Sequence, residues 1–325
     1  MIEVKHLTKN YGRHTAVSDL SFTVEKGQIY GFLGPNGAGK TTTMSIMTGC
    51  LAATSGQVTI DGHDIFEEAL EAKKLIGYLP EQPPLYLDRT PREYLTFVGR
   101  AKGVQGAELS RQIQQIMKTT QIEDVQDRLI KNLSKGYRQR VGIAQALMGD
   151  PEVIILDEPT VGLDPRQIIE IRELIAELGK NHTVILSSHI LSEVQAICNT
   201  ILIIANGRLI ACDTPENLEK LFAGAASVVL TADAAEADAL AIVRKASPGA
   251  AAEVVAAKDG QTTVRVEARD SEALCRSLFF AFAQEKKALT QLTTAKASLE
   301  DIFIELTEAD VPVPAATAEK EAQTA

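Results

Sequence analysis

Residues 28–41 read Gln28-Ile-Tyr-Gly-Phe-Leu-Gly-Pro-Asn-Gly-Ala-Gly-Lys-Thr41, and this stretch decides the fold. Its first six residues are mostly apolar and predict a buried strand that ends at a glycine. A helix is expected from about Lys40. Residues 34–41 match the pattern G-x-x-x-x-G-K-[ST], in the strand-to-helix context that this pattern requires. The alternative, a glycine-rich turn with a solvated lysine, does not account for that context.

The glycines of this loop let consecutive backbone N–H groups point inward around a phosphate, and the start of the following helix adds a positive dipole. Lys40 can reach the outer phosphates of a nucleotide, and Thr41 can hold Mg²⁺. We therefore expect the loop to bind a nucleotide. The predicted contacts are Gly34, Pro35, Asn36, Gly37, Ala38, Gly39, Lys40, Thr41 and Thr42.

Strands and helices alternate after the loop, which is the pattern of an α/β fold with a mostly parallel sheet. Residues 153–156, Val-Ile-Ile-Leu, are apolar on both faces, as a strand covered on two sides requires. Helices are predicted at 165–178 and 191–198, and helical spacing extends over 92–130. The other predicted strands of this part are 2–6, 20–25, 58–62, 76–79, 183–187 and 200–205.

Three further motifs follow the loop. They are Leu133-Ser-Lys-Gly-Tyr-Arg-Gln-Arg140, then Asp157-Glu-Pro-Thr160 with Gly162-Leu-Asp-Pro165, and finally Ser187-Ser-His189. Their order and intervals make residues 1–215 resemble the ATP-binding cassette (ABC) family of transporter ATPases. The resemblance implies a P-loop NTPase domain with a helical subdomain at about 83–150, which hydrolyses ATP with Mg²⁺.

Physical reasons support the roles that the resemblance implies. A carboxylate at the end of a buried strand is costly unless it faces a cation, so Asp157 is expected to hold Mg²⁺. Glu158 can position or deprotonate the attacking water. His189 can donate a hydrogen bond to the γ-phosphate. The alternatives are a capping role for Asp157 and a merely structural histidine.

The resemblance also implies contacts at the two ends of the nucleotide. Tyr11 matches the aromatic residue that stacks on adenine, although a half-buried strand tyrosine is an alternative. The signature loop, Ser134, Lys135, Gly136 and Tyr137, opens a helix and would contact ATP held by a second subunit. The chain should therefore close as a head-to-tail dimer, with Asp164 at the seam, and either a homodimer or a heterodimer fits.

Two departures from the family pattern stand out. Lys135 and Tyr137 replace a glycine and a glutamine of the common signature Leu-Ser-Gly-Gly-Gln. In Gly77-Tyr-Leu-Pro-Glu-Gln-Pro83 the usual glutamine position is Glu81, and Gln82 comes one later, so either residue could contact Mg²⁺; Gln82 is the predicted ligand. These motifs look like cassettes of the ABC-2 exporter group, near its gliding-motility and drug-resistance branches.

Alanine content divides the chain. Residues 220–325 contain 28 alanines and residues 1–219 contain 14, so a domain boundary is predicted at 219/220. Strands and helices in the order βαββαβ predict a small α+β, ferredoxin-like accessory domain over 220–310. Residues 298–307 read as a further helix, and 311–325 read as a disordered tail. The purpose of this domain is open among regulation, dimer contact and a structural appendage.

Composition narrows the function. The net charge of −10 argues against a protein held by nucleic-acid phosphates, and no apolar run approaches the roughly 20 residues that cross a bilayer. We expect a cytoplasmic ATPase subunit, peripheral on the inner face of the membrane through a separate permease, and the ABC-2 resemblance favours export over import. The alternatives are a soluble ABC ATPase acting on ribosomes or DNA, and a binding-only cassette, which the presence of Glu158 disfavours. The sequence does not identify the transported substrate.

Overall fold

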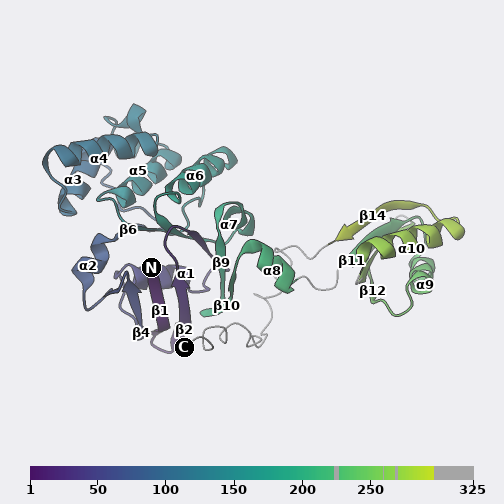
Figure 1. Cartoon of the computed structure of the whole chain (residues 1–325). Helices are drawn as coiled ribbons and strands as arrows, with labels where there is room; N and C mark the ends of the chain where they lie inside the picture. Colours follow the sequence, from purple (N-terminus) through teal and green to yellow (C-terminus); the bar gives the residue numbers. More distant parts are fainter. Residues whose placement is uncertain (223–226, 259, 268–269, 296–325) are drawn as a thin grey trace. The chain divides into compact units, whose positions relative to one another are not determined.

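A computed structural model of the chain describes residues 1–222, 227–258, 260–267 and 270–295. These residues form two compact units, one containing Met1–Pro215 and the other beginning at Glu216, and each is described by itself (Figure 1). The division falls in α8 (Pro215–Phe222), the helix that also contains the boundary predicted from alanine content.

The strands of the first unit form two sheets. An antiparallel sheet has the order β2-β1-β4-β5, and a six-stranded sheet has the order β10-β9-β3-β8-β7-β6, parallel except for β10 against β9. The strands are β1 (Ile2–Tyr11), β2 (His14–Val24), β3 (Ile29–Leu33), β4 (Ser55–Ile60), β5 (His63–Asp64), β6 (Ile76–Leu79), β7 (Val153–Leu156), β8 (Thr183–Ser188), β9 (Thr200–Ala205) and β10 (Arg208–Asp213).

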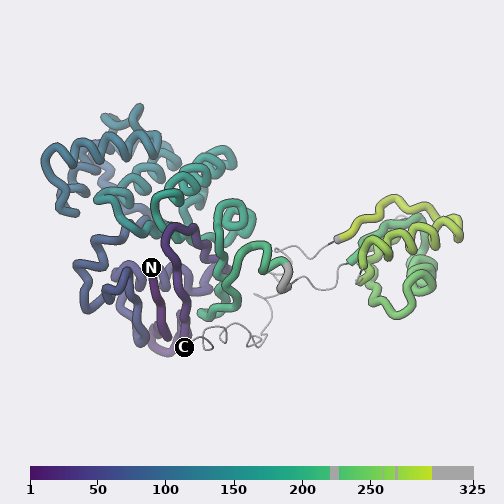
Figure 2. The backbone as a smooth tube through the Cα atoms, in the orientation of Figure 1, coloured from purple at the N-terminus to yellow at the C-terminus, as the bar shows by residue number. Residues whose placement is uncertain are grey.

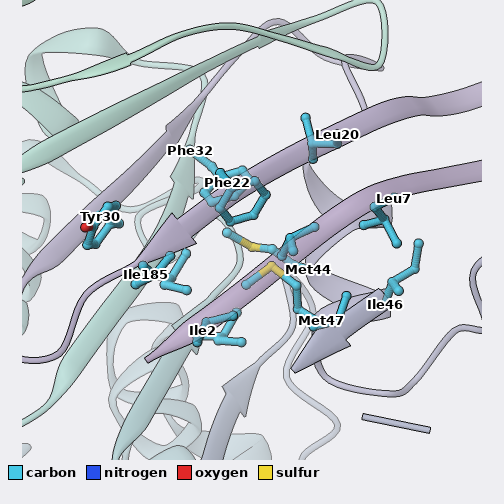
Figure 3. Packing of buried hydrophobic residues seen from close by; sticks show 14 of the residues in the cluster. Ile2, Leu7, Leu20, Phe22, Tyr30, Phe32, Met44, Ile46, Met47 and Ile185 are labelled. Carbon is cyan, nitrogen blue, oxygen red and sulfur yellow. The ribbon is translucent and has the colours of Figure 1, made fainter. Parts of the chain in front are cut away.

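The core of this unit joins the two sheets. Leu7 and Phe22 of the antiparallel sheet, Phe32 and Ile185 of the six-stranded sheet, and Met44 of α1 (Lys40–Met47) belong to one buried cluster. Figure 3 shows their side chains converging, and the Phe22 and Phe32 rings meet edge to face at 5.2 Å. The helix that begins where the phosphate loop ends is therefore anchored in the buried core of the unit.

Three helices, α3 (Pro91–Ala101), α4 (Gly106–Thr119) and α5 (Lys135–Leu147), contact one another. They group at one end of the unit, opposite the antiparallel sheet (Figures 1 and 2). Thr90 and Glu93 form a capping box at the start of α3, which fixes where the helix begins. The remaining helices of the unit are α2 (Ala69–Lys74), η1 (Glu123–Val125), η2 (Ile130–Asn132), α6 (Pro165–Leu178) and α7 (Leu191–Ile197).

The second unit has the predicted order βαββαβ. Its antiparallel sheet, β12-β13-β11-β14, buries one face under two helices, around Leu230, Val264 and Phe282. The elements are β11 (Ser227–Ala232), α9 (Glu236–Ala246), β12 (Ala252–Lys258), β13 (Gln261–Glu267), α10 (Ser271–Gln284) and β14 (Leu289–Ala295). The helix predicted at 298–307 and the tail predicted at 311–325 lie outside the described residues.

Candidate functional site

The loop at 34–39 joins β3 to α1, as the sequence predicts. Gly39 caps α1 with φ +102°, and a Cβ there would lie 2.6 Å from the carbonyl oxygen of Ala16, so no other residue fits without distortion. Lys40 Nζ donates to the carbonyl oxygens of Gly34 (2.8 Å) and Pro35 (3.3 Å). The ammonium group is thus held directly above the loop.

Asp157 follows β7 and faces Thr41 across the sheet edge. Its Oδ1 accepts hydrogen bonds from Thr41 Oγ1 at 3.3 Å and Ser187 Oγ at 2.6 Å. The residue is fully buried, and this burial raises the pKa of its carboxyl group, while the two hydrogen bonds oppose the rise. Its other oxygen, Oδ2, is buried without a hydrogen-bond partner. An orphaned carboxylate oxygen beside a threonine hydroxyl fits Mg²⁺, which prefers oxygen ligands.

Glu158 is held from several sides. Its Oε1 lies 3.4 Å from Lys40 Nζ, its Oε2 lies 3.0 Å from His189 Nδ1, and its backbone N–H donates to Ser187 Oγ at 2.8 Å. Its φ of +47° is left-handed, which costs a non-glycine residue on the order of 1–3 kcal/mol and persists only where neighbours enforce it. The structure thus orients this carboxylate toward the lysine and the histidine.

Lys40, Thr41, Glu158 and His189 line one cleft of about 500 Å³, and Asp157 is not among its lining residues. It contains predicted residues from separate parts of the sequence, and it also contains His14, Ala16 and Val161, which no motif indicated. Glu81 lines the cleft, and Gln82 is not among its lining residues. Tyr11 lies at the edge, 49% exposed, with Lys9 Nζ 5.2 Å from its ring centroid. The predicted residues that line the cleft are Tyr11, Asn36, Gly37, Gly39, Lys40, Thr41, Thr42, Glu158 and His189.

The predicted signature loop forms a separate hollow of about 150 Å³, which shares no lining residue with the cleft. Ser134 caps α5 by accepting a hydrogen bond from the N–H of Tyr137 at 3.3 Å. The Tyr137 hydroxyl donates to Asp124 at 2.7 Å, so the residue that replaces the family's glutamine is tied to η1. The sequence-predicted loop residues in the hollow are Ser134, Gly136 and Tyr137, together with Gln167 at the start of α6.

Lys135 and Asp164 lie beside this hollow. A Cβ added to Gly162 would come within 2.1 Å of Lys135 Nζ, so the lysine lies against the segment that leads to α6. Asp164 caps α6, because its Oδ1 accepts a hydrogen bond from the N–H of Gln167 at 3.0 Å. The capping role observed for Asp164 is a local one, and its predicted place at a dimer seam stays a prediction.

Sequence reasoning assigned no role to Ser187 or Glu193. Ser187 is fully buried and bridges the carboxylate of Asp157 and the backbone of Glu158. Glu193 is buried on α7 and accepts hydrogen bonds from Thr160 and Ser188. The available signals were a hydroxyl pair that ends a buried strand and an acidic residue between the buried Leu191 and Val194, which is unusual on a packed helix face.

A phosphate loop on a parallel sheet, with a buried aspartate and an oriented glutamate opposite it, defines the class of P-loop nucleotide-binding proteins. Comparison with known proteins narrows this class. Residues 17–161 match the ABC transporter family. LnrL of Bacillus subtilis, a linearmycin resistance ATP-binding protein, is 32% identical over 94% of this chain and 98% of its own length. BcrA of Bacillus licheniformis, a bacitracin transport ATP-binding protein, is 41% identical over 65% of this chain and 68% of its own length.

Solved structures agree. The ATP-binding subunit of an ABC transporter superimposes with a TM-score of 0.63 at 31% identity, covering 68% of this chain and 93% of that one. A dimeric bacterial ABC transporter cassette, MJ0796, gives a TM-score of 0.61 at 26% identity, covering 66% of this chain and 98% of its own. The chain belongs to the ATP-binding subunits of ABC transporters, and the predicted fold, ATP binding and ATPase class are confirmed.

Residues 1–222, 227–258, 260–267 and 270–295 include no helix with the combined length and hydropathy of a membrane span.

Proposed function

We propose that the chain powers an exporter of the ABC-2 type by hydrolysing ATP between two cassettes coupled to a separate permease. The names of its relatives support export, since they include linearmycin resistance, bacitracin transport and lantibiotic transport proteins. The observation that carries the proposal is the position of Glu158, a buried carboxylate oriented toward a cleft that also contains the phosphate loop.

In the proposed reaction the loop N–H groups and Lys40 hold the phosphates of ATP. Thr41 and Asp157 would hold Mg²⁺, which neutralises charge on the phosphate oxygens when bound. Glu158 orients the attacking water and accepts its proton, and His189 donates to the γ-phosphate. Because Lys40 already contacts Glu158, binding of a phosphate exchanges one anionic partner of the lysine for another.

Two assignments at the edges of the cleft follow from position. The half-exposed ring of Tyr11 in the cleft lining supports its role in stacking on adenine. Of the two residues that fit the loop after β6, the place of Glu81 in the cleft lining supports Glu81 over Gln82 as the residue nearest the metal.

The separation of the cleft from the signature hollow supports the head-to-tail dimer. Ser134 and Gly136 line a hollow of their own, so one copy does not bring them to its own phosphate loop. A second copy, turned by a two-fold axis, can present this hollow to the bound ATP. ATP would then join the two copies, with Asp164 at the seam, and hydrolysis would release them. The dimeric state of a related cassette is consistent with this arrangement.

A hollow of about 580 Å³ beside α3 supports a permease contact. Its lining includes Tyr86, Tyr94 and Phe97, whose rings lie 5.3–5.6 Å apart in two neighbouring pairs. Tyr86 and Phe97 are about half exposed, at 48% and 52%. We assign this surface to a short cytoplasmic helix of the permease, because exposed aromatic side chains are typical anchors of protein interfaces. Such a contact would keep the chain on the inner face of the membrane.

The substitution Glu158→Gln tests the proposal. We expect ATP turnover to fall by about 10²-fold or more, since the amide cannot accept the proton of water. ATP binding should persist, and size-exclusion chromatography with ATP should show an accumulated dimer. Glu173→Gln, an exposed change on α6, is the matched control. Turnover of the Glu158→Gln protein at the parental rate would exclude the mechanism.

A further inference from the structure

We propose that Glu193 is a positioning residue for ATP hydrolysis. From the first turn of α7 it ties the segment that carries Glu158 to the segment that carries His189. The inference rests on the proposed roles of these two residues, and it concerns how their contact is maintained rather than which of them reacts.

The ties are two hydrogen bonds to a single carboxylate oxygen. Oε2 of Glu193 accepts from Thr160 Oγ1 at 2.6 Å and from Ser188 Oγ at 3.2 Å. Thr160 lies two residues after Glu158, and Ser188 directly precedes His189. One side chain therefore links the segment that follows β7 to the end of β8.

The chemistry of this tie is unusual for a residue that only fills space. Glu193 and Thr160 are each 6% exposed, and Ser188 is 1% exposed. A buried carboxylate carries a large desolvation cost unless donors surround it, so a leucine would fill the same position on α7 more easily. Glu193 does not line the nucleotide cleft. Its effect on the reaction must therefore pass through the two hydroxyl groups that it binds.

The two hydrogen bonds of Glu193 both affect the contact between Glu158 and His189. The N–H of Val161 donates to the carbonyl oxygen of Glu158 at 3.2 Å, which closes a turn that includes Thr160. On the other side the N–H of Ile190 donates to Ser188 Oγ at 3.0 Å and closes the turn over His189. With Glu193 bound to both turns, the 3.0 Å contact between Glu158 Oε2 and His189 Nδ1 is fixed at each end.

Glu193 donates and accepts no hydrogen bond with the phosphate loop, and Lys40, although 3.4 Å from Glu158 Oε1, is held to the loop by the carbonyl oxygens of Gly34 and Pro35. Loss of Glu193 should thus affect the hydrolytic step and leave the binding of ATP to the loop largely unchanged. This separation of kcat from nucleotide affinity is the signature of a positioning residue.

The full-length protein with Glu193→Ala is the first test. We expect kcat to fall about 10–100-fold, the range typical of residues that orient a reacting group through another side chain. The Kd for ATP, measured by equilibrium binding with Ca²⁺ replacing Mg²⁺, should change less than about twofold, as expected for a group that acts only on hydrolysis. Glu193→Gln should recover part of kcat, since the amide oxygen still accepts a hydrogen bond. Glu173→Ala on the exposed face of α6 is the matched control and should behave as the parent.

Thr160→Val provides a second variant in case Glu193→Ala folds poorly. It removes the shorter of the two bonds and leaves the carboxylate with Ser188, so kcat should again fall while ATP affinity is retained. Parental kcat in both variants, accompanied by a lowered melting temperature, would overturn the inference and leave Glu193 as a purely structural residue.

A double variant separates this inference from the proposed function. If Glu193 acts through Glu158, adding Glu193→Ala to Glu158→Gln should lower the residual rate no further, because the oriented group is already gone. Losses that multiply would overturn the inference. Failure of the proposed function has a different result, namely parental turnover in Glu158→Gln alone, whereas failure of the inference gives parental turnover in Glu193→Ala with Glu158→Gln inactive.

Discussion

At the scale of single residues, Asp157 lies where Mg²⁺ is expected, and the burial of its charged carboxylate lowers the free energy of unfolding. Burial raises the pKa of its carboxyl group above the ordinary value of 3.8, so the folded chain binds a proton more tightly than the unfolded chain. Between the two pKa values stability falls as pH rises, and above them the charged, buried carboxylate destabilises the fold. A metal ion bound to Oδ2, the oxygen without a hydrogen-bond partner, would offset this destabilisation.

We therefore expect Asp157→Asn to stabilise the protein in a metal chelator at neutral pH while abolishing turnover. The amide keeps an acceptor for Thr41 and Ser187 and has no charge to desolvate. The melting temperature should rise by about 2–4 °C, the shift that each kcal/mol gives in a chain of this size. The gain should shrink as pH falls through the raised folded-state pKa and vanish below 3.8, where the parental carboxyl becomes protonated in both states. A melting temperature below that of the parent at neutral pH would contradict this argument.

Ser187 offers a second prediction at this scale. Ser187→Ala removes the donor to Asp157 and leaves the buried N–H of Glu158 without its acceptor. An unsatisfied buried polar group costs about 1–3 kcal/mol, so the free energy of unfolding should fall by that amount in a urea titration. Ser110→Ala, at an exposed position of α4, serves as control. Equal stabilities of the two variants would show that Ser187 does not hold the left-handed Glu158.

At the scale of elements, α3 and the loop before it contain the surface assigned to the permease. Phe97→Glu places a charge on its half-exposed aromatic cluster, and we expect co-purification with the permease to fall at least tenfold. The basal ATPase rate of the isolated chain should stay within about twofold, since Phe97 lies outside the nucleotide cleft. Leu70→Glu, a change at a 79% exposed leucine of α2, is the matched control. Equal loss in both variants would indicate general damage.

The elements also show how far sequence can predict this fold. Strongly apolar or periodic segments, such as β6, β9 and α6, were predicted with the observed bounds. Burial of a sheet or helix face requires apolar residues at regular spacing, and this spacing can be recognised in the local sequence. The strands β1 and β2 extend well beyond the predictions, since their outer halves, around Lys9 and Thr15, are polar and are held by pairing with each other. The short β5, which is only His63 and Asp64, was not predicted for the same reason, and the edge strand β10, paired with β9 alone, was not predicted either.

The residues of the candidate site likewise fall into those that local sequence predicts and those that it does not. Residues next to a motif glycine or at the end of an apolar strand, such as Lys40 and Asp157, were found because local sequence determines their surroundings. The contact between Thr160 and Glu193 joins residues 33 positions apart and depends on how α7 packs, which no local pattern encodes. The choice between Glu81 and Gln82 likewise depended on which of two neighbouring exposed side chains lies at the cleft.

At the scale of the whole molecule, two separate cores predict two unfolding transitions. Phe32 in the first unit and Phe282 in the second are both fully buried, and each belongs to a cluster within its own unit. Truncating a buried phenylalanine to alanine costs about 3–5 kcal/mol, which is a large share of the stability of a small α+β unit. We expect Phe282→Ala to lower one transition in scanning calorimetry and Phe32→Ala to lower the other.

The same pair of variants separates the ATPase from the accessory unit. Glu158, proposed as the catalytic carboxylate, the phosphate loop and the signature hollow all lie in the first unit, so Phe282→Ala should retain the kcat of the isolated chain within about twofold. Phe32→Ala should lose activity at temperatures above its lowered transition, because Phe32 belongs to the strand that leads into the phosphate loop. A single transition that both variants shift equally would mean that the units unfold together. In that case the alanine-rich part of the chain would be integral to the cassette and could not be regarded as an appendage.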